Sequence, residues 1–126
     1  MTFLENRKQL KYRKKPITLE HYPRVAIVVP CWNEEKTVGR TVESLLALNY
    51  PKDKLEIILI DDGSTDNTLA VMKTFEGVQG IKVIHKENGG KHTATNMGIA
   101  MTDTPYIGCL DADSFVHPEA LTRMMT

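Results

Sequence analysis

The fold is decided at residues 55–66, which read LEIILIDDGSTD. Residues 55–60 form an apolar run of strand length that is rich in isoleucine, and such a run predicts a buried β-strand. The acidic pair Asp61-Asp62 follows at once. Gly63 then predicts a turn, and Ser64 or Thr65 is expected to cap a helix. That helix is predicted to carry three apolar side chains, namely Leu69, Met72 and Phe75.

The same strand-to-helix pattern recurs along the chain. Three further apolar runs predict strands, over residues 25–29, 81–84 and 106–110. Helices are predicted over residues 34–48 with Asn33 as N-cap, over 91–101 with a stripe of Ala94, Met97, Gly98 and Met101, and over 117–125. Strands that alternate with helices imply an α/β fold, a mostly parallel sheet with right-handed crossovers and helices on both faces.

Length and composition fit one globular domain. The chain has 126 residues, of which 41% are hydrophobic and 25% charged, and no apolar run approaches the ~20 residues of a membrane span. The formal net charge is zero, yet residues 1–24 hold seven Lys/Arg against two acids. We therefore expect residues 1–23 to form a flexible basic arm and residues 24–126 to form the domain.

The basic arm has two interpretations. It is a solvated tail, or it lies beside anionic lipid, where each basic residue contributes roughly 1 kcal/mol. A nucleic-acid partner is not expected, because no stacking aromatics or base-reading helix follow the arm. Two cysteines, Cys31 and Cys109, suit a reducing compartment and form neither a disulfide framework nor a zinc pattern.

Polar clusters follow three of the predicted strands. These clusters are Trp32-Asn33-Glu34, Asp61-Asp62 and Asp111-Ala-Asp113. In a parallel sheet, the carboxyl ends of the strands meet at one edge, where ligands bind near a switch in strand order. The three clusters are therefore predicted to converge on one binding site.

The types of residue in these clusters indicate their chemistry. Two carboxylates at Asp111 and Asp113 suit a hard cation such as Mg²⁺ or Mn²⁺, although Asp is also common in plain turns. Because side chains alternate along a strand, Asp61 and Asp62 should point differently: one braces the loop and the other bonds a base or ribose. Trp32 either stacks on a nucleobase or packs on the rim.

A helix N-terminus adds a possible anion site. Lys91 opens a helix after the turn Asn88-Gly-Gly, where it holds phosphate or is simply exposed. The chain contains neither GxxxxGK[ST] nor a GxGxxG segment after its first strand, which argues against a nucleoside triphosphatase or a dinucleotide enzyme.

Four motifs in this order resemble those of the inverting nucleotide-sugar glycosyltransferases of family two. They are Val28-Val-Pro-Cys-Trp-Asn-Glu-Glu35, Asp61-Asp-Gly-Ser-Thr-Asp66, Asn88-Gly-Gly-Lys-His-Thr-Ala-Thr-Asn-Met-Gly98 and Asp111-Ala-Asp113. The resemblance covers residues 24–126. It is strongest to the processive membrane synthases of poly-N-acetylglucosamine, hyaluronan, cellulose and chitin.

This resemblance implies the glycosyltransferase A fold, whose Rossmann-like first half binds the nucleotide. The implied uracil and ribose pocket comprises Pro30, Trp32, Asn33 and Glu34. The resemblance further implies that Asp62 contacts uracil with Asp61 bracing it, that Lys91 lies near the base or phosphates, that Asp111 reaches the ribose or metal, and that Asp113 binds Mn²⁺ or Mg²⁺.

The resemblance also implies an activity for the parent enzyme. It would transfer N-acetylglucosamine or glucose from a UDP-sugar donor, with inversion, to a polysaccharide acceptor at the cytoplasmic face of the cell membrane. We expect the general base to lie beyond Thr126, together with the acceptor half and the transmembrane helices. This chain is therefore expected to be a soluble, inactive donor-binding fragment. The alternatives are a non-catalytic nucleotide-binding or interaction module and a nucleotidyltransferase.

Overall fold

The structure is a computed structural model that describes residues 2–5 and 22–125. In these residues the strands are β1 (Thr2–Glu5), β2 (Val25–Cys31), β3 (Leu55–Asp62), β4 (Lys82–Lys86) and β5 (Tyr106–Cys109). The α-helices are α2 (Val38–Leu46), α3 (Thr68–Lys73), α4 (Lys91–Ala100) and α5 (Ala120–Met124). Short 3₁₀ turns, η1 (Lys52–Lys54) and η2 (Val78–Gly80), precede β3 and β4.

The strands form one sheet in the order β1-β5-β2-β3-β4. Strands β2, β3, β4 and β5 are parallel, which confirms the predicted α/β fold with its mostly parallel sheet. The chain steps outward from β2 to β3 and β4 and then returns to place β5 on the other side of β2. This reversal puts the switch in strand order between β2 and β5, which is where α/β sheets bind ligands.

Strand β1 is an addition to the prediction. It pairs antiparallel with β5, with Thr2 opposite Cys109 and Glu5 opposite Tyr106. No strand was predicted before residue 25, because this short segment carries no pattern that predicts it without its partner. Residues 6–21 of the predicted basic arm lie outside the described residues.

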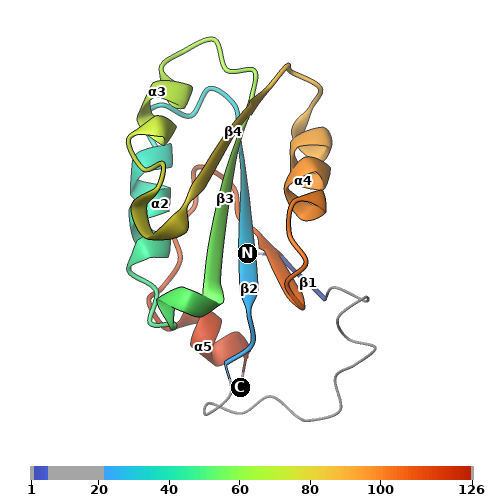
Figure 1. The fold of residues 1–126 in the computed structure, drawn as a ribbon. Coiled ribbons are helices and arrows are strands. Elements are labelled where there is room, and N and C mark those ends of the chain that lie inside the picture. The colour runs from blue at the N-terminus through green and yellow to red at the C-terminus, as the bar shows by residue number, and fades with distance from the viewer. Residues whose placement is uncertain (1, 6–21, 126) are drawn as a thin grey trace.

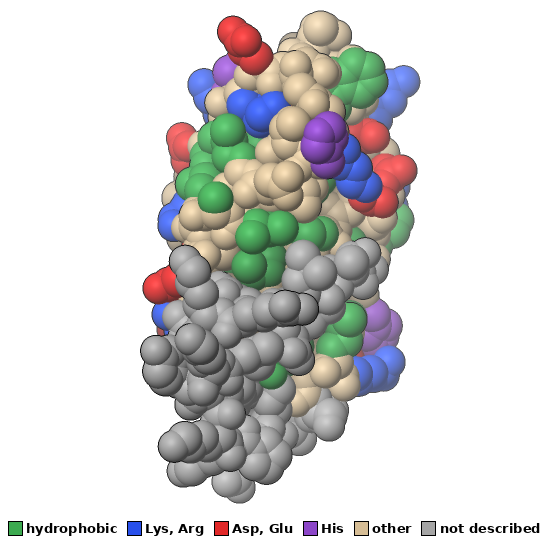
Figure 2. All heavy atoms as spheres, turned by 90° about the vertical axis from the view of Figure 1, so that its right-hand side faces the viewer, with side chains coloured by type: hydrophobic (Ala, Val, Ile, Leu, Met, Phe, Trp, Pro, Cys, Tyr) green, Lys and Arg blue, Asp and Glu red, His purple; other side chains and the backbone are tan. Residues whose placement is uncertain are grey.

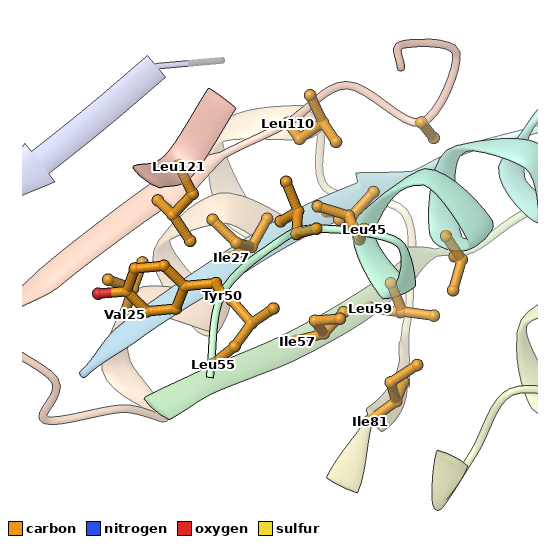
Figure 3. Close-up of a cluster of buried hydrophobic side chains, with 14 of the residues drawn as sticks. Val25, Ile27, Leu45, Tyr50, Leu55, Ile57, Leu59, Ile81, Leu110 and Leu121 are labelled. Carbon is orange, nitrogen blue, oxygen red and sulfur yellow. The ribbon is translucent and has the colours of Figure 1, made fainter. Parts of the chain in front are cut away.

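Helices cover both faces of the sheet, with α2 and α3 on one face and α4 on the other (Figure 1). The larger core lies under α2, where Ile27 and Leu59 meet Leu45 (Figure 3). The smaller core lies under α4 and holds Val28 and Ile60. Alternate residues of β2 and β3 thus pack into the cores on opposite faces of the sheet. Nearly every residue of these two strands is buried.

Gly98 lets helix α4 pack directly against the side chains of the sheet. A Cβ atom at this position would lie 2.4 Å from Cγ1 of Val28. Of the predicted stripe, the structure buries Ala94 and Gly98, whereas Met97 and Met101 are each more than a third exposed. The outer face of α4 is turned to the viewer in Figure 2, where hydrophobic side chains lie among uncharged surface.

Three helix starts differ from the prediction. Helix α2 begins at Val38 rather than at residue 34, and Thr37 occupies the N-cap position without a side-chain cap bond. Helix α3 begins at Thr68, with neither Ser64 nor Thr65 as its cap. Helix α5 begins at Ala120 rather than at residue 117. In the first two cases the polar side chains expected to cap a helix instead join neighbouring loops, as described below.

Candidate functional site

A cavity of about 570 Å³ opens at the carboxyl ends of β2, β3 and β5. This volume falls in the range of small-molecule sites. The lining residues are Pro30, Cys31, Trp32, Glu34, Asp62, Asn88, Gly90, Lys91, Asp111, Ala112 and Asp113. All three polar clusters predicted to converge contribute to this cavity, and it lies at the switch in strand order.

Asp62 is held on the cavity wall by three donated hydrogen bonds, from the Lys86 ammonium and from two backbone amides. Lys86 Nζ lies 2.6 Å from Oδ1, and the backbone amides of Gly89 and Gly90 donate to Oδ1 and Oδ2 over 3.1 and 3.0 Å. Burial disfavours the charged carboxylate, but the bonds from Lys86, Gly89 and Gly90 outweigh it, so the pKa of Asp62 lies below its usual range. Asp62 therefore stays ionised and acts only as an acceptor.

Lys86 is a residue that the sequence analysis missed. It also donates to the Glu87 carbonyl and, over 2.9 Å, to Thr93 Oγ1 of α4, so it joins β3, β4 and α4 at the cavity. The alternation of side chains along β4 places Lys86 on the same face as Ile84, toward α4. This alternation alone does not indicate a role for Lys86. The β3–β4 register does, because it places Lys86 directly beside Asp62.

Asp61 and Asp62 point to opposite faces of the sheet, as the strand alternation predicted. Asp61 is fully buried and accepts hydrogen bonds from His85 Nδ1 at 2.7 Å and from the Ser64 amide at 3.3 Å. The side chain of Asp61 does not line the cavity. Its place in the structure is that of a brace for the loop after β3.

The segment after β2 contributes Trp32 to the cavity rim, where this residue is 52% exposed. Glu34 also lines the cavity, and its Oε2 accepts a bond of 2.9 Å from Thr37. Asn33 does not line it. Instead, Asn33 adopts a positive φ of 50° and accepts a 2.8 Å bond from the Thr65 amide, which ties this segment to the loop after β3.

Asp111 and Asp113 both face the cavity after β5. Asp111 forms an ion pair with Lys91, which opens α4, and both side chains are more than half exposed. In the described part of the chain, no group of three or more His, Cys, Asp or Glu side chains is arranged to hold a metal ion. A Mg²⁺-type ion usually takes one or two protein carboxylates and completes its shell with water and phosphate. The two aspartates fit such an ion only with a bound diphosphate.

The two cysteines lie on opposite faces of the sheet and are not bonded to each other. Burial, with the charges of Asp61 and Glu34, raises the pKa of the Cys31 thiol far above its usual range. Burial also raises the pKa of Cys109. Neither thiol is therefore an activated nucleophile. Among residues 2–5 and 22–125, no helix combines the length and hydropathy needed to cross a bilayer.

Comparison with curated proteins finds relatives that include synthases of an N-acetylglucosamine polymer. The chain is 38% identical over 117 residues to poly-beta-1,6-N-acetyl-D-glucosamine synthase of Staphylococcus aureus strain COL. The alignment covers 90% of this chain and 28% of that protein. The synthase of the same name from Staphylococcus epidermidis is 39% identical over 97 residues, which is 76% of this chain and 23% of that protein. The chain thus spans less than a third of the length of these relatives.

Solved structures share the fold. The crystal structure of S. aureus TarS 1-349 in complex with UDP-GlcNAc has a TM-score of 0.74 and 26% identity, over 80% of this chain and 30% of that one. The mannosyltransferase PcManGT from Pyrobaculum calidifontis, in complex with GDP-Man and Mn²⁺, has a TM-score of 0.74 and 23% identity over 89% of this chain and 34% of that one. Residues 26–126 match the family described as Glycosyl transferase family 2. With its motifs at the carboxyl ends of a parallel sheet, this chain belongs to glycosyl transferase family 2, a family of sugar-transferring enzymes.

Proposed function

We propose that this chain is the donor-binding part of an inverting glycosyltransferase that transfers N-acetylglucosamine or glucose from a UDP-sugar to a growing polysaccharide. One observation carries the proposal, namely the convergence of Trp32, Asp62, Lys91 and the Asp111/Asp113 pair on a single cavity at the switch in strand order. The relatives named as N-acetylglucosamine polymer synthases support the sugar and the product.

Each cavity residue has a role in this proposal that follows from its chemistry. The exposed ring of Trp32 stacks on the base. The ionised Asp62 accepts a hydrogen bond from the base, which favours uracil because its N3 carries a proton. Lys91 and the N-terminus of α4 attract the diphosphate. Pro30 and Glu34 complete the wall beside the ribose, while Asp61 and Asn33 act behind it as braces.

Asp111 and Asp113 are the residues that would hold a divalent cation, Mn²⁺ or Mg²⁺, together with the donor diphosphate. When bound, such an ion would neutralise the diphosphate and help it to leave. Asp111 is paired with Lys91 through Oδ1, so a cation at Asp111 would compete with Lys91 for this carboxylate. Lys91 would then be available to a phosphate oxygen.

The described carboxylates leave no free general base in the cavity. Inversion needs a base that deprotonates the acceptor hydroxyl. Asp62 is bonded to Lys86 and two amides and is assigned to the base, Glu34 is bonded to Thr37, and Asp111 and Asp113 are assigned to the cation. We therefore propose that this chain by itself binds the donor without transferring sugar, and that the parent enzyme acts on its polysaccharide acceptor at the cytoplasmic face of the membrane.

Isothermal titration calorimetry of the chain with UDP tests the proposal. We expect weak binding with MnCl₂, loss of binding with a chelator, and loss of the Mn²⁺ effect in Asp113→Asn. The matched control is Asp103→Asn, an exposed carboxylate paired with Arg24 outside the cavity, which should bind UDP as the unchanged chain does. Equal UDP binding with metal and with chelator would refute the cation role. Equal binding of UDP and CDP would refute the role of Asp62 in base selection, because cytosine N3 carries no proton.

A further inference from the structure

Asp61 and its partner His85 form a contact that the proposed nucleotide site does not use directly. Asp61 is fully buried, so its carboxylate has lost its water. Its hydrogen bonds run to His85 Nδ1 at 2.7 Å and to the Ser64 amide at 3.3 Å. A carboxylate oxygen is an acceptor, so we take His85 Nδ1 as the donor in this contact. The ring of His85 itself is 54% exposed on β4.

The Asp61 carboxylate continues into a chain of contacts that ends at the cavity. It holds the Ser64 amide, and Ser64 Oγ accepts the Asn33 amide at 2.9 Å. Asn33 Oδ1 in turn accepts the Thr65 amide at 2.8 Å. These bonds hold Asn33 in a left-handed conformation, with φ of 50°, that non-glycine residues seldom adopt without support. Trp32, the residue before Asn33, forms the cavity rim.

We propose that His85 is a positioning residue for the nucleotide site. It fixes Asp61, Asp61 fixes the turn at Ser64, and that turn fixes the segment that carries Trp32. His85 does not line the cavity and touches no ligand in this proposal. The effect on nucleotide binding rests on the proposed function, whereas the effect on the loop itself does not.

The substitution His85→Val removes the donor from a half-exposed position on β4 and keeps a residue that favours strands. The buried carboxylate is then left with the Ser64 amide as its remaining described partner. His85→Asn is the rescue variant, since its Nδ2 lies where the histidine has Nδ1. Lys82→Val is the matched control, because Lys82 is an exposed residue of the same strand that pairs with Glu56.

Amide hydrogen exchange, followed residue by residue by NMR on the ligand-free chain, is the deciding measurement. In His85→Val, exchange at Asn33 and Thr65 should accelerate about tenfold, as expected for a lost hydrogen bond to a charged group. Exchange at Ile27 and Ile57 in the core strands should stay unchanged. His85→Asn should return Asn33 to nearly the original rate, and Lys82→Val should leave it unchanged.

A second arm measures UDP affinity, which should fall about tenfold in His85→Val and recover in His85→Asn. If the unchanged chain binds no UDP, the proposed function fails, and the exchange rates still decide the inference. The positioning role of His85 is overturned if exchange at Asn33 is unchanged in His85→Val. It is also overturned if exchange accelerates equally at Asn33 and Ile27. If His85→Val does not fold, Ser64→Ala decides through the next contact: it should accelerate exchange at Asn33, and no acceleration there overturns the relay.

Discussion

Replacing Lys86 by methionine tests whether the buried ion pair with Asp62 holds the cavity wall together. The side chains are 13% and 4% exposed, and Nζ lies 2.6 Å from Oδ1. Removal of one partner from a buried pair costs about 3–5 kcal/mol because the remaining charge is left uncompensated. Asp62 keeps its two bonds from the Gly89 and Gly90 amides, so we expect the low end of this range, about 3 kcal/mol.

The assay is equilibrium unfolding in urea, followed by circular dichroism, for the unchanged chain, Lys86→Met and the control Lys82→Met. Lys82 pairs with Glu56 over 3.3 Å on the same strand, but these side chains are 51% and 22% exposed. An exposed pair of this kind contributes about 0–1 kcal/mol. The two substitutions remove the same side chain from one strand and differ chiefly in the burial of the ion pair.

The cost of Lys86→Met should also depend on pH. In the folded chain the pKa of Asp62 lies below its usual range, so its charged form adds stability above pH about 4 and loses that contribution as pH falls through the folded-state pKa. Without Lys86 that pKa rises. The free-energy difference between the two chains should therefore be largest near neutral pH and shrink in acid. A cost equal to that of Lys82→Met, or one independent of pH, would refute the assignment.

Three further predictions follow from packing, thiol burial and the absence of a free base among the described cavity residues. Gly98→Ala should lower the stability by about 1–3 kcal/mol in thermal unfolding, because the new Cβ would lie 2.4 Å from Val28, whereas Gly39→Ala, with its nearest neighbour at 3.7 Å, should be neutral or stabilising. Reaction of the native chain with a thiol reagent at pH 8 should label Cys109 before Cys31, since Cys31 is only 1% exposed; labelling in the reverse order would contradict the buried placement of Cys31. Incubation of the chain with UDP-N-acetylglucosamine, Mn²⁺ and an oligosaccharide primer should give no extended product by mass spectrometry, and primer extension would show that one of the cavity acids acts as the base.

The burial of Asp62 limits what a substitution at this position can report. Asp62 lies at a strand end, yet only 3% of it is exposed, and it is bonded to Lys86. Asp62→Ala would leave Lys86 unpaired and disturb the fold as well as the ligand. Asp62→Asn, which keeps the shape and one acceptor oxygen, is the better probe of base selection.

The sequence alone predicted the parallel strands, their alternation with helices and the three polar clusters at strand ends. These features are local, because a buried strand needs its own apolar run, and a strand end is marked by the polar residues that follow it. The opposed directions of Asp61 and Asp62 were predicted for the same reason, since alternation is a property of one strand.

Tertiary structure decided the features that need a partner from elsewhere in the chain. The return of β5 beside β2 brings Asp111 and Asp113 to the cavity, and the β3–β4 register pairs Asp62 with Lys86. Asn33 was expected to cap a helix, but its side-chain oxygen accepts a hydrogen bond from the Thr65 amide in the loop after β3. Helix α2 starts later, at Val38. Sequence spacing predicts which polar groups are available, whereas only the packed chain determines which of them meet, because each hydrogen bond is decided by competition among neighbours brought together by folding.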